Sequence, residues 1–182
     1  KRLSVVSTGW DILRGTLRIR SLINRYDPAI LHARVHVPAL MAHFARKTVP
    51  SRRPKLLFDI RGFFPEEYVD AGVWRENSLI YRIAKIVERR LLNDSDGFVV
   101  LTEKARDILF PESLENGTDR LGRPVEVIPC CVDLEKFRLP DAGKARAGAR
   151  ARLGVSDRTV IVYVGSCGGW YLTRETVDFR VR

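Results

Sequence analysis

Five short apolar runs restrict the fold of this chain more than any other feature. They occupy residues 29–32, 55–58, 97–101, 125–128 and 159–164. As a group they show no regular alternation with polar residues, which is typical of strands buried on both faces of a parallel sheet. Between them, apolar residues recur at helical spacing over residues 10–26, 37–46, 77–93 and 103–109. This order of strands and helices predicts an α/β fold with a doubly wound, Rossmann-like parallel sheet.

Two of the expected helices are basic and amphipathic. Trp10 to Tyr26 interleaves apolar residues with arginines, and Asn77 to Asn93 carries an apolar stripe with Lys85 and three arginines expected outside it. Such a basic face is most often simply solvated, and contact with a membrane or a partner is the alternative.

The formal charge of +10 is the one unusual bulk property of the 182 residues. Nucleic acid, an anionic membrane or phosphate-bearing substrates would suit it, and so would a generally arginine-rich proteome. We expect neither a transmembrane helix nor a signal peptide, because no apolar run has the required length. The three cysteines, two of them adjacent, suit neither a disulfide framework nor a zinc site, which favours a reduced, cytoplasmic location.

Polar residues lie at or just after the carboxyl ends of the predicted strands. Ligands of a doubly wound sheet bind beyond the carboxyl ends of its strands, so we expect these residues to converge on one edge. They are His32, Arg34, His36, Asp59, Arg61, Thr102 and Glu103, with Cys130 and Cys131 after the fourth strand and Gly165, Ser166, Gly168 and Gly169 after the fifth.

Other roles are open for the first of these residues. His32 and His36 have the spacing of a metal-binding pair, but no acidic third ligand is near in sequence, and we expect no metal. Asp59 and Arg61 either contact a substrate or pair with neighbours to hold the loop of residues 59–74, and the two readings are equally open.

Glu66 and Glu67 follow Pro65, where acidic residues favour a helix start, and a catalytic carboxylate there is the minority interpretation. Cys130 and Cys131 are expected to be small, buried packing residues. The glycine-rich turn that begins at Gly165 precedes a helix expected over residues 172–182. Its N–H groups could bind a diphosphate, although the turn matches neither GxGxxG nor a P-loop.

Six segments, in order, resemble family 4 of the GT-B glycosyltransferases (glycosyl transferases group 1). They are HARVHVPAL, KLLFDIRGFFPEEYVDAGVW, LIYRIAKIVERRLL, FVVLTEKA, VIPCCVDLEKF and IVYVGSCGGWYL. The most specific is VIPCCVDLEKF, which is similar to the family's IPNGVD…F turn at its domain boundary. The resemblance covers most of residues 10–179.

The resemblance implies two Rossmann-like domains facing across a cleft, with the acceptor in the first and a nucleotide-sugar, such as a UDP- or GDP-sugar, in the second. It implies transfer with retention and without a metal, in which helix N-termini and basic side chains stabilise the departing diphosphate. We therefore expect residues 1–138 to form part of the acceptor domain, 139–157 a basic connector and 158–182 the start of the donor domain.

By position, the catalytic slot after the second strand holds Asp59 and Arg61 in place of the family's usual His. The acceptor side would comprise His32, Arg34, His36, Glu66, Thr102 and Glu103, and the donor side Gly165, Ser166, Gly168 and Gly169. Ser166 and the Trp170–Tyr171 region replace the Arg and Lys that commonly bind the diphosphate.

The family's first strand and its acidic donor motif do not occur in these residues, so we expect a fragment without activity of its own. The acceptor would be a glycan, a lipid-linked sugar or a small molecule. A peripheral membrane protein at the cytoplasmic face is compatible with this interpretation. A basic nucleic-acid-binding module is the rival, but the sequence carries no helix-turn-helix, zinc knuckle or RNP-like strand, and we expect no nucleic acid.

Overall fold

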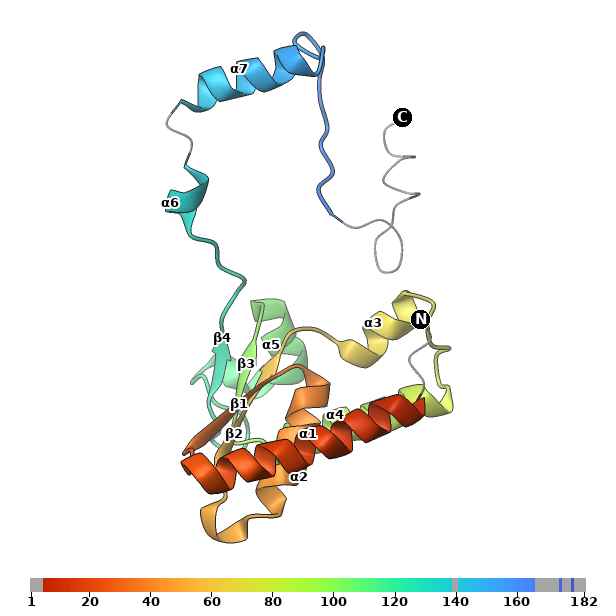
Figure 1. Cartoon of the computed structure of the whole chain (residues 1–182), viewed down its shortest axis with the longest axis vertical. Helices are drawn as coiled ribbons and strands as arrows, with labels where there is room; N and C mark the ends of the chain where they lie inside the picture. The colour runs from red at the N-terminus through yellow and green to blue at the C-terminus, as the bar shows by residue number, and fades with distance from the viewer. Residues whose placement is uncertain (1–4, 139–140, 166–173, 175–177, 179–182) are drawn as a thin grey trace. The chain divides into compact units, whose positions relative to one another are not determined.

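The computed structural model describes residues 5–138, 141–165, 174 and 178. The chain divides into two compact units, Lys1–Pro129 and Cys130–Arg182, which are considered one at a time (Figure 1). Among the described residues, no helix is long and apolar enough to cross a membrane.

The first unit holds a four-stranded sheet in the order β1-β2-β3-β4, and every neighbouring pair is parallel. The strands are β1 (Ile30–Arg34), β2 (Lys55–Ile60), β3 (Gly97–Val100) and β4 (Val125–Val127). The predicted fold class, an α/β fold with a Rossmann-like parallel sheet, is confirmed.

Helices occupy the segments before and between these strands. They are α1 (Val5–Tyr26), α2 (His36–Lys47), α3 (Phe64–Asp70), α4 (Leu79–Asp94) and α5 (Glu103–Leu109), with short 3-10 helices at Pro50–Arg52 and Pro111–Leu114. Each predicted helix of this unit is confirmed with small shifts at its ends, and α1 begins five residues before the expected Trp10.

The core lies between the sheet and one layer of helices. Crossovers between parallel strands are right-handed, so a sheet whose strands follow in sequence order places its crossover helices on the same face. Leu56, Phe58 and Ile60 of β2 point to that face and pack in one cluster with residues such as Ala42 of α2 and Leu91 of α4. Figure 1 shows α1 beside α2, in contact with it.

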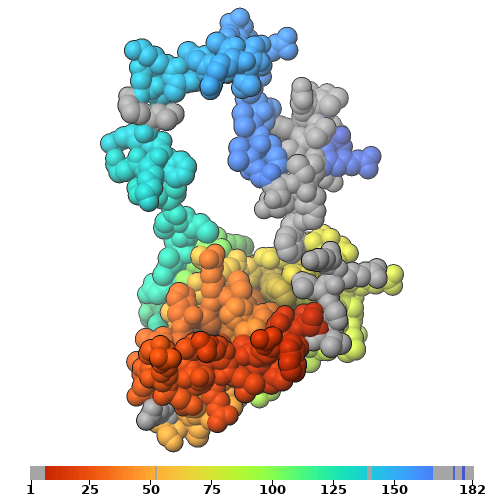
Figure 2. All heavy atoms as spheres, viewed as in Figure 1, coloured from red at the N-terminus to blue at the C-terminus, as the bar shows by residue number. Residues whose placement is uncertain are grey.

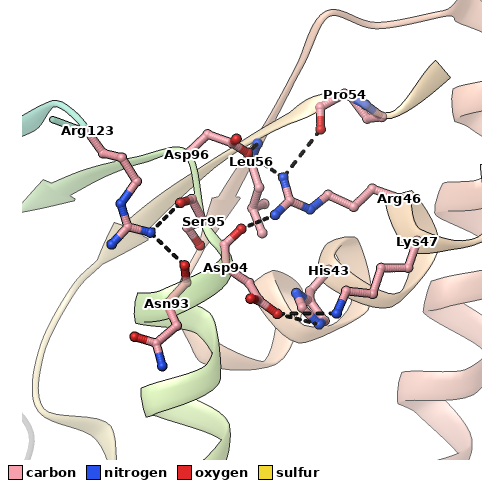
Figure 3. A network of polar contacts seen from close by, with 10 residues as sticks. All are labelled: His43, Arg46, Lys47, Pro54, Leu56, Asn93, Asp94, Ser95, Asp96 and Arg123. Carbon is pink, nitrogen blue, oxygen red and sulfur yellow. Dashed lines mark hydrogen bonds and ion pairs between the residues drawn. The ribbon is translucent and has the colours of Figure 1, made fainter. Parts of the chain in front are cut away.

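A polar network lies at the amino-terminal ends of β2 and β3 (Figure 3). The Asp96 carboxylate, directly before β3, accepts a hydrogen bond from the Leu56 backbone N–H at 2.8 Å and another from the fully buried Arg46 guanidinium. Arg46 also donates to the backbone carbonyl of Asp94. These bonds tie α2, β2 and the end of α4 together.

The second unit contains α6 (Leu134–Phe137) and α7 (Ala142–Arg152), and α7 lies within the basic connector of residues 139–157. The strand expected at residues 159–164 is wrong, because these residues form no strand and most of their apolar side chains are exposed. A strand needs a neighbour to pair with, and the described part of this unit offers none. The helix expected over residues 172–182 lies almost wholly outside the described residues.

Cys130 and Cys131 are exposed, so the expectation of buried packing residues is wrong. They follow β4 at the start of the second unit rather than within the core.

Candidate functional site

The carboxyl-terminal halves of β1 and β2 bring three predicted site residues together. Asp59 Oδ2 lies 3.1 Å from His32 Nε2, and Asp59 Oδ1 lies 3.5 Å from Arg61 Nε. The Asp59 side chain is only 8% exposed, whereas those of His32 and Arg61 are 59% and 23% exposed. A buried carboxylate is therefore held between an exposed imidazole and a partly exposed guanidinium.

Strand alternation explains this arrangement. Phe58 and Ile60 point into the core, so Asp59 between them points to the opposite face of the sheet. Arg34 is the register partner of Asp59, and His32 stands two residues earlier on the same face.

One sequence expectation is corrected at this point. Arg34 and Asp59 were expected beyond the strand ends, but they lie inside β1 and β2, and His32, expected as the last residue of its strand, lies in the middle of β1. Backbone pairing continues past the apolar run, because it does not depend on side-chain polarity.

The pair formed by Asp59 and Arg61 leaves hydrogen-bonding capacity unused. A separation of 3.5 Å is long for a hydrogen bond. Asp59 Oδ1 and Arg61 Nε are both buried, and neither has a hydrogen-bond partner within the described part of the chain. Buried polar atoms are nearly always satisfied, and these two atoms are exceptions within the described residues.

The contact between His32 and Asp59 has a chemical consequence. When Nε2 carries the proton and donates it to the carboxylate, Nδ1 is the acceptor nitrogen of the ring. An exposed imidazole oriented by a buried carboxylate can accept a proton from a bound hydroxyl group. The guanidinium of Arg61 adds a fixed positive charge beside it.

A second cluster joins two further predicted residues, His36 and Glu66, through α4. His36 begins α2, is buried, and places Nε2 at 3.4 Å from Glu88 Oε1. Lys85 contacts the Glu88 carboxylate and also binds Glu66 Oε1 at 2.9 Å, while the Tyr81 hydroxyl donates to Glu66 Oε1 at 3.2 Å. The cluster fixes the loop that carries Arg61 against α4.

Ionisation in this cluster follows its contacts. Burial by itself would raise the pKa of Glu88, but the contacts with His36 and Lys85 outweigh it and hold that pKa below its usual value. Burial would likewise lower the pKa of Lys85, but the two carboxylates raise it above its usual value.

Sequence reasoning missed Lys85 and Glu88. Lys85 was expected outside the apolar stripe, yet its side chain is 31% exposed and paired on both sides. The available signal was Glu88, a charged residue at helical spacing from Ala84 and Leu91 and therefore on the face that packs inward.

The remaining predicted residues lie apart from these two clusters. Thr102 caps α5, its hydroxyl accepting from the Ala105 backbone N–H at 3.0 Å, and Glu103 is exposed and paired with Arg106. Glu66 and Glu67 occupy the first turn of α3, as a helix start predicts. Gly165 is exposed in the second unit, and Ser166, Gly168 and Gly169 lie outside the described residues.

Within the described ranges, no three or more His, Cys, Asp or Glu side chains are grouped so that they could hold a metal ion. His32 and His36 belong to different clusters, one on the open face of β1 and the other buried against α4.

Comparison with known proteins identifies the family. The family model described as Glycosyltransferase Family 4 matches residues 4–136, a span that includes the whole sheet and both clusters. No curated protein matches the chain. The family model covers well over half of the 182 residues and agrees with the resemblance carried by the sequence motifs. The chain belongs to glycosyltransferase family 4.

Proposed function

We propose that this protein is a retaining glycosyltransferase that moves a sugar from a nucleotide-sugar, such as a UDP- or GDP-sugar, to a hydroxyl group of an acceptor. Family membership supports glycosyl transfer in general. The observation that carries the proposed site is the cluster of His32, Asp59 and Arg61 on neighbouring parallel strands. The acceptor would be a glycan, a lipid-linked sugar or a small molecule.

In this proposal Asp59 holds His32 in the tautomer whose Nδ1 faces the acceptor. For the configuration to be retained, the acceptor oxygen must approach the anomeric carbon from the same face that the diphosphate leaves. The bond to the diphosphate breaks with its electron pair leaving on the diphosphate, the new bond to the acceptor oxygen forms on that face, and the acceptor proton passes to Nδ1. In the proposal, the guanidinium of Arg61 would stabilise the negative charge that develops on the departing diphosphate. Basic side chains would take the role of a cation, so the proposal includes no metal.

The other candidates have supporting roles in the proposal. Arg34, beside Asp59 in the register, would contact the acceptor, and His36 and Glu66 would position the loop after β2. Thr102 and Glu103 would lie along the acceptor side, and Gly165 to Gly169 would belong to the donor side. A cytoplasmic location, supported by the cysteine usage, completes the proposal.

The test is a transfer assay with the protein expressed from its natural gene, using radiolabelled UDP- and GDP-sugars and mixtures of glycan and lipid acceptors. We expect Asp59→Asn and His32→Gln to lower kcat by about 10²-fold or more, because general-base catalysis contributes that much. The anomeric configuration of the product should match that of the donor.

Asp70→Asn is the matched control, because Asp70 is an exposed carboxylate at the end of α3. Melting curves would show that each variant is folded. Wild-type turnover by both His32→Gln and Asp59→Asn would overturn the assignment of this site, and an inverted product would overturn the retaining mechanism.

A further inference from the structure

Two adjacent cysteines, Cys130 and Cys131, form the most reactive group of side chains that the proposed function does not use. Neither cysteine forms a disulfide, and both are exposed. They follow β4, and Cys130 is the first residue of the second unit. Figure 2 shows the segment that follows β4, in teal, uncovered in this view. Small reagents in solution can therefore reach both thiols.

Backbone and side-chain hydrogen bonds hold the chain on both sides of the pair. Before it, the Ile128 N–H donates to the Val100 carbonyl at 2.9 Å, which extends the pairing of β4 with β3. After it, Asp133 caps α6, and its Oδ1 accepts from the Glu135 N–H at 3.1 Å. The two cysteines lie in the short stretch 129–132, which belongs to neither element.

Three ordinary roles of cysteine do not fit this pair. Exposure excludes a packing role in the core. A disulfide between adjacent residues closes no loop of chain, so it would contribute almost nothing to the stability of the fold. A structural zinc ion needs four ligands, and the described ranges group no third His, Cys, Asp or Glu with the pair in a way that could hold a metal ion. Reversible oxidation, in contrast, suits an exposed thiol that has a second thiol beside it.

We propose that Cys130 and Cys131 are a reversible redox site that reacts with a small-molecule disulfide, such as glutathione disulfide. The thiolate of one cysteine attacks a sulfur of this disulfide, displaces one small thiol and forms a mixed disulfide. The thiolate of the neighbouring cysteine then attacks the protein sulfur of the mixed disulfide and displaces the second small thiol. The protein gains one S–S bond and loses two electrons, the small disulfide is reduced to two thiols, and these thiols take up the two protons of the cysteines.

Sequence adjacency favours ring closure and makes its product easy to reduce. The second thiol is tethered one peptide bond away, so closure is an intramolecular step with a high effective concentration. Consecutive Cα atoms lie about 3.8 Å apart across a trans peptide, whereas disulfides usually join Cα atoms about 4.4–6.8 Å apart. The closed ring is therefore strained, and strain makes a disulfide more reducible. We expect it to form when disulfides are abundant and to open when thiols are in excess, as labile disulfides do.

The test is oxidation of the purified 182-residue chain by glutathione disulfide, followed by mass spectrometry of the intact protein. Cys167, which lies outside the described residues, is replaced by serine so that only the adjacent pair can react. We expect this Cys167→Ser protein to lose two hydrogens and to carry no glutathione. The tryptic peptide of residues 121–136 should contain both oxidised cysteines, and excess dithiothreitol should restore the original mass.

Variants with one cysteine test the role of the neighbouring thiol. Cys130→Ser and Cys131→Ser, each combined with Cys167→Ser, should stop at the mixed disulfide and retain one glutathione. Cys130→Ser with Cys131→Ser is the matched control, because Cys167 alone cannot close a ring. The proposal uses none of the residues of the proposed transferase site, so its test requires no enzymatic activity.

A second reagent shows whether the two sulfurs can meet. Phenylarsine oxide bonds to two thiols and releases water, so it should prevent the reaction of the Cys167→Ser protein with glutathione disulfide but not that of the single-cysteine variants. Absence of this protection would overturn the proposal. Glutathione that stays attached to the Cys167→Ser protein, no reaction at all, or a covalent dimer in place of the closed ring would also overturn it.

Discussion

Acid should destabilise the first unit through His43, a histidine of α2 whose side chain is completely buried. Its pKa is lowered from 6.5 to about 4, chiefly by burial and next by the nearby Lys47 ammonium. Asp94, whose Oδ2 lies 3.5 Å from His43 Nε2, acts in the opposite direction, while Arg46 and Arg90 add to the lowering. The folded protein therefore keeps this imidazole neutral at pH values at which the unfolded chain protonates it.

The sign and size of the effect follow from linkage. Between the folded pKa of about 4 and the unfolded value of 6.5, the unfolded state binds more protons, so stability falls as the pH falls. The contribution is complete above pH 6.5 and is lost progressively toward pH 4. From pH 7 to pH 5 the free energy of unfolding should drop by about 2 kcal/mol through this residue alone.

Urea unfolding of wild type and His43→Phe at pH 7, 6 and 5 measures this drop. Phenylalanine cannot bind a proton and preserves an aromatic ring beside Phe44, whose ring centroid lies 5.5 Å from that of His43. The other titrating groups are common to both proteins, so the difference between them isolates His43. Lys47→Met should raise the folded pKa and reduce the drop. Parallel stability profiles of wild type and His43→Phe between pH 7 and 5 would refute the reasoning.

Three further predictions concern contacts within the first unit. Arg46→Ala should lower the free energy of unfolding by about 3 kcal/mol, because it leaves Asp96 without its cation, and Arg46→Lys should lower it less. Urea unfolding measures both losses, and a loss below about 1 kcal/mol for Arg46→Ala would contradict a stabilising role of the network. Thr102→Ala should lower the free energy of unfolding by about 1 kcal/mol, because it removes the hydroxyl that caps α5, and Thr102→Ser should retain most of that stability. Equal urea unfolding of wild type and Thr102→Ala would show that the cap contributes nothing. Lys85→Met should lower the free energy of unfolding more at pH 7 than at pH 4. At pH 7 the variant buries a charged Glu88 without its cation, whereas at pH 4 Glu88 of the variant can take up a proton and become neutral. An equal loss at both pH values would argue against this ion pair.

Local signals in the sequence were sufficient for most of the helices and for the parallel sheet. Helix α5 begins directly after Thr102, as its capping hydroxyl predicts, and Pro28 follows soon after the end of α1. The apolar runs located β3 almost to the residue. In each of these cases, the determinant lies within a few residues of the element it specifies.

Long-range pairing could not be predicted in the same way. The register between β1 and β2 determines where these strands end, and the apolar runs of the sequence do not indicate this register. The same register brings His32 into contact with Asp59. The pairing of Lys85 with Glu66 depends on the packing of α3 against α4, which the sequence alone does not indicate. Residues 159–164 have strand composition, but a strand also depends on its neighbours.

Asp59 is the residue at which stability and function should separate. The two readings of this carboxylate, a structural partner of Arg61 or a group that serves a ligand, predict opposite effects of Asp59→Asn. A structural ion pair would lose stability, since breaking a buried pair leaves the remaining charge uncompensated. The distance of 3.5 Å between Oδ1 and Arg61 Nε, and the absence of hydrogen bonds to both atoms within the described chain, indicate that the pair is not satisfied. We therefore expect the asparagine variant to unfold at the same urea concentration as wild type or a higher one, while its transferase activity is lost. A destabilisation of about 2 kcal/mol or more, with activity retained, would make Asp59 a structural residue.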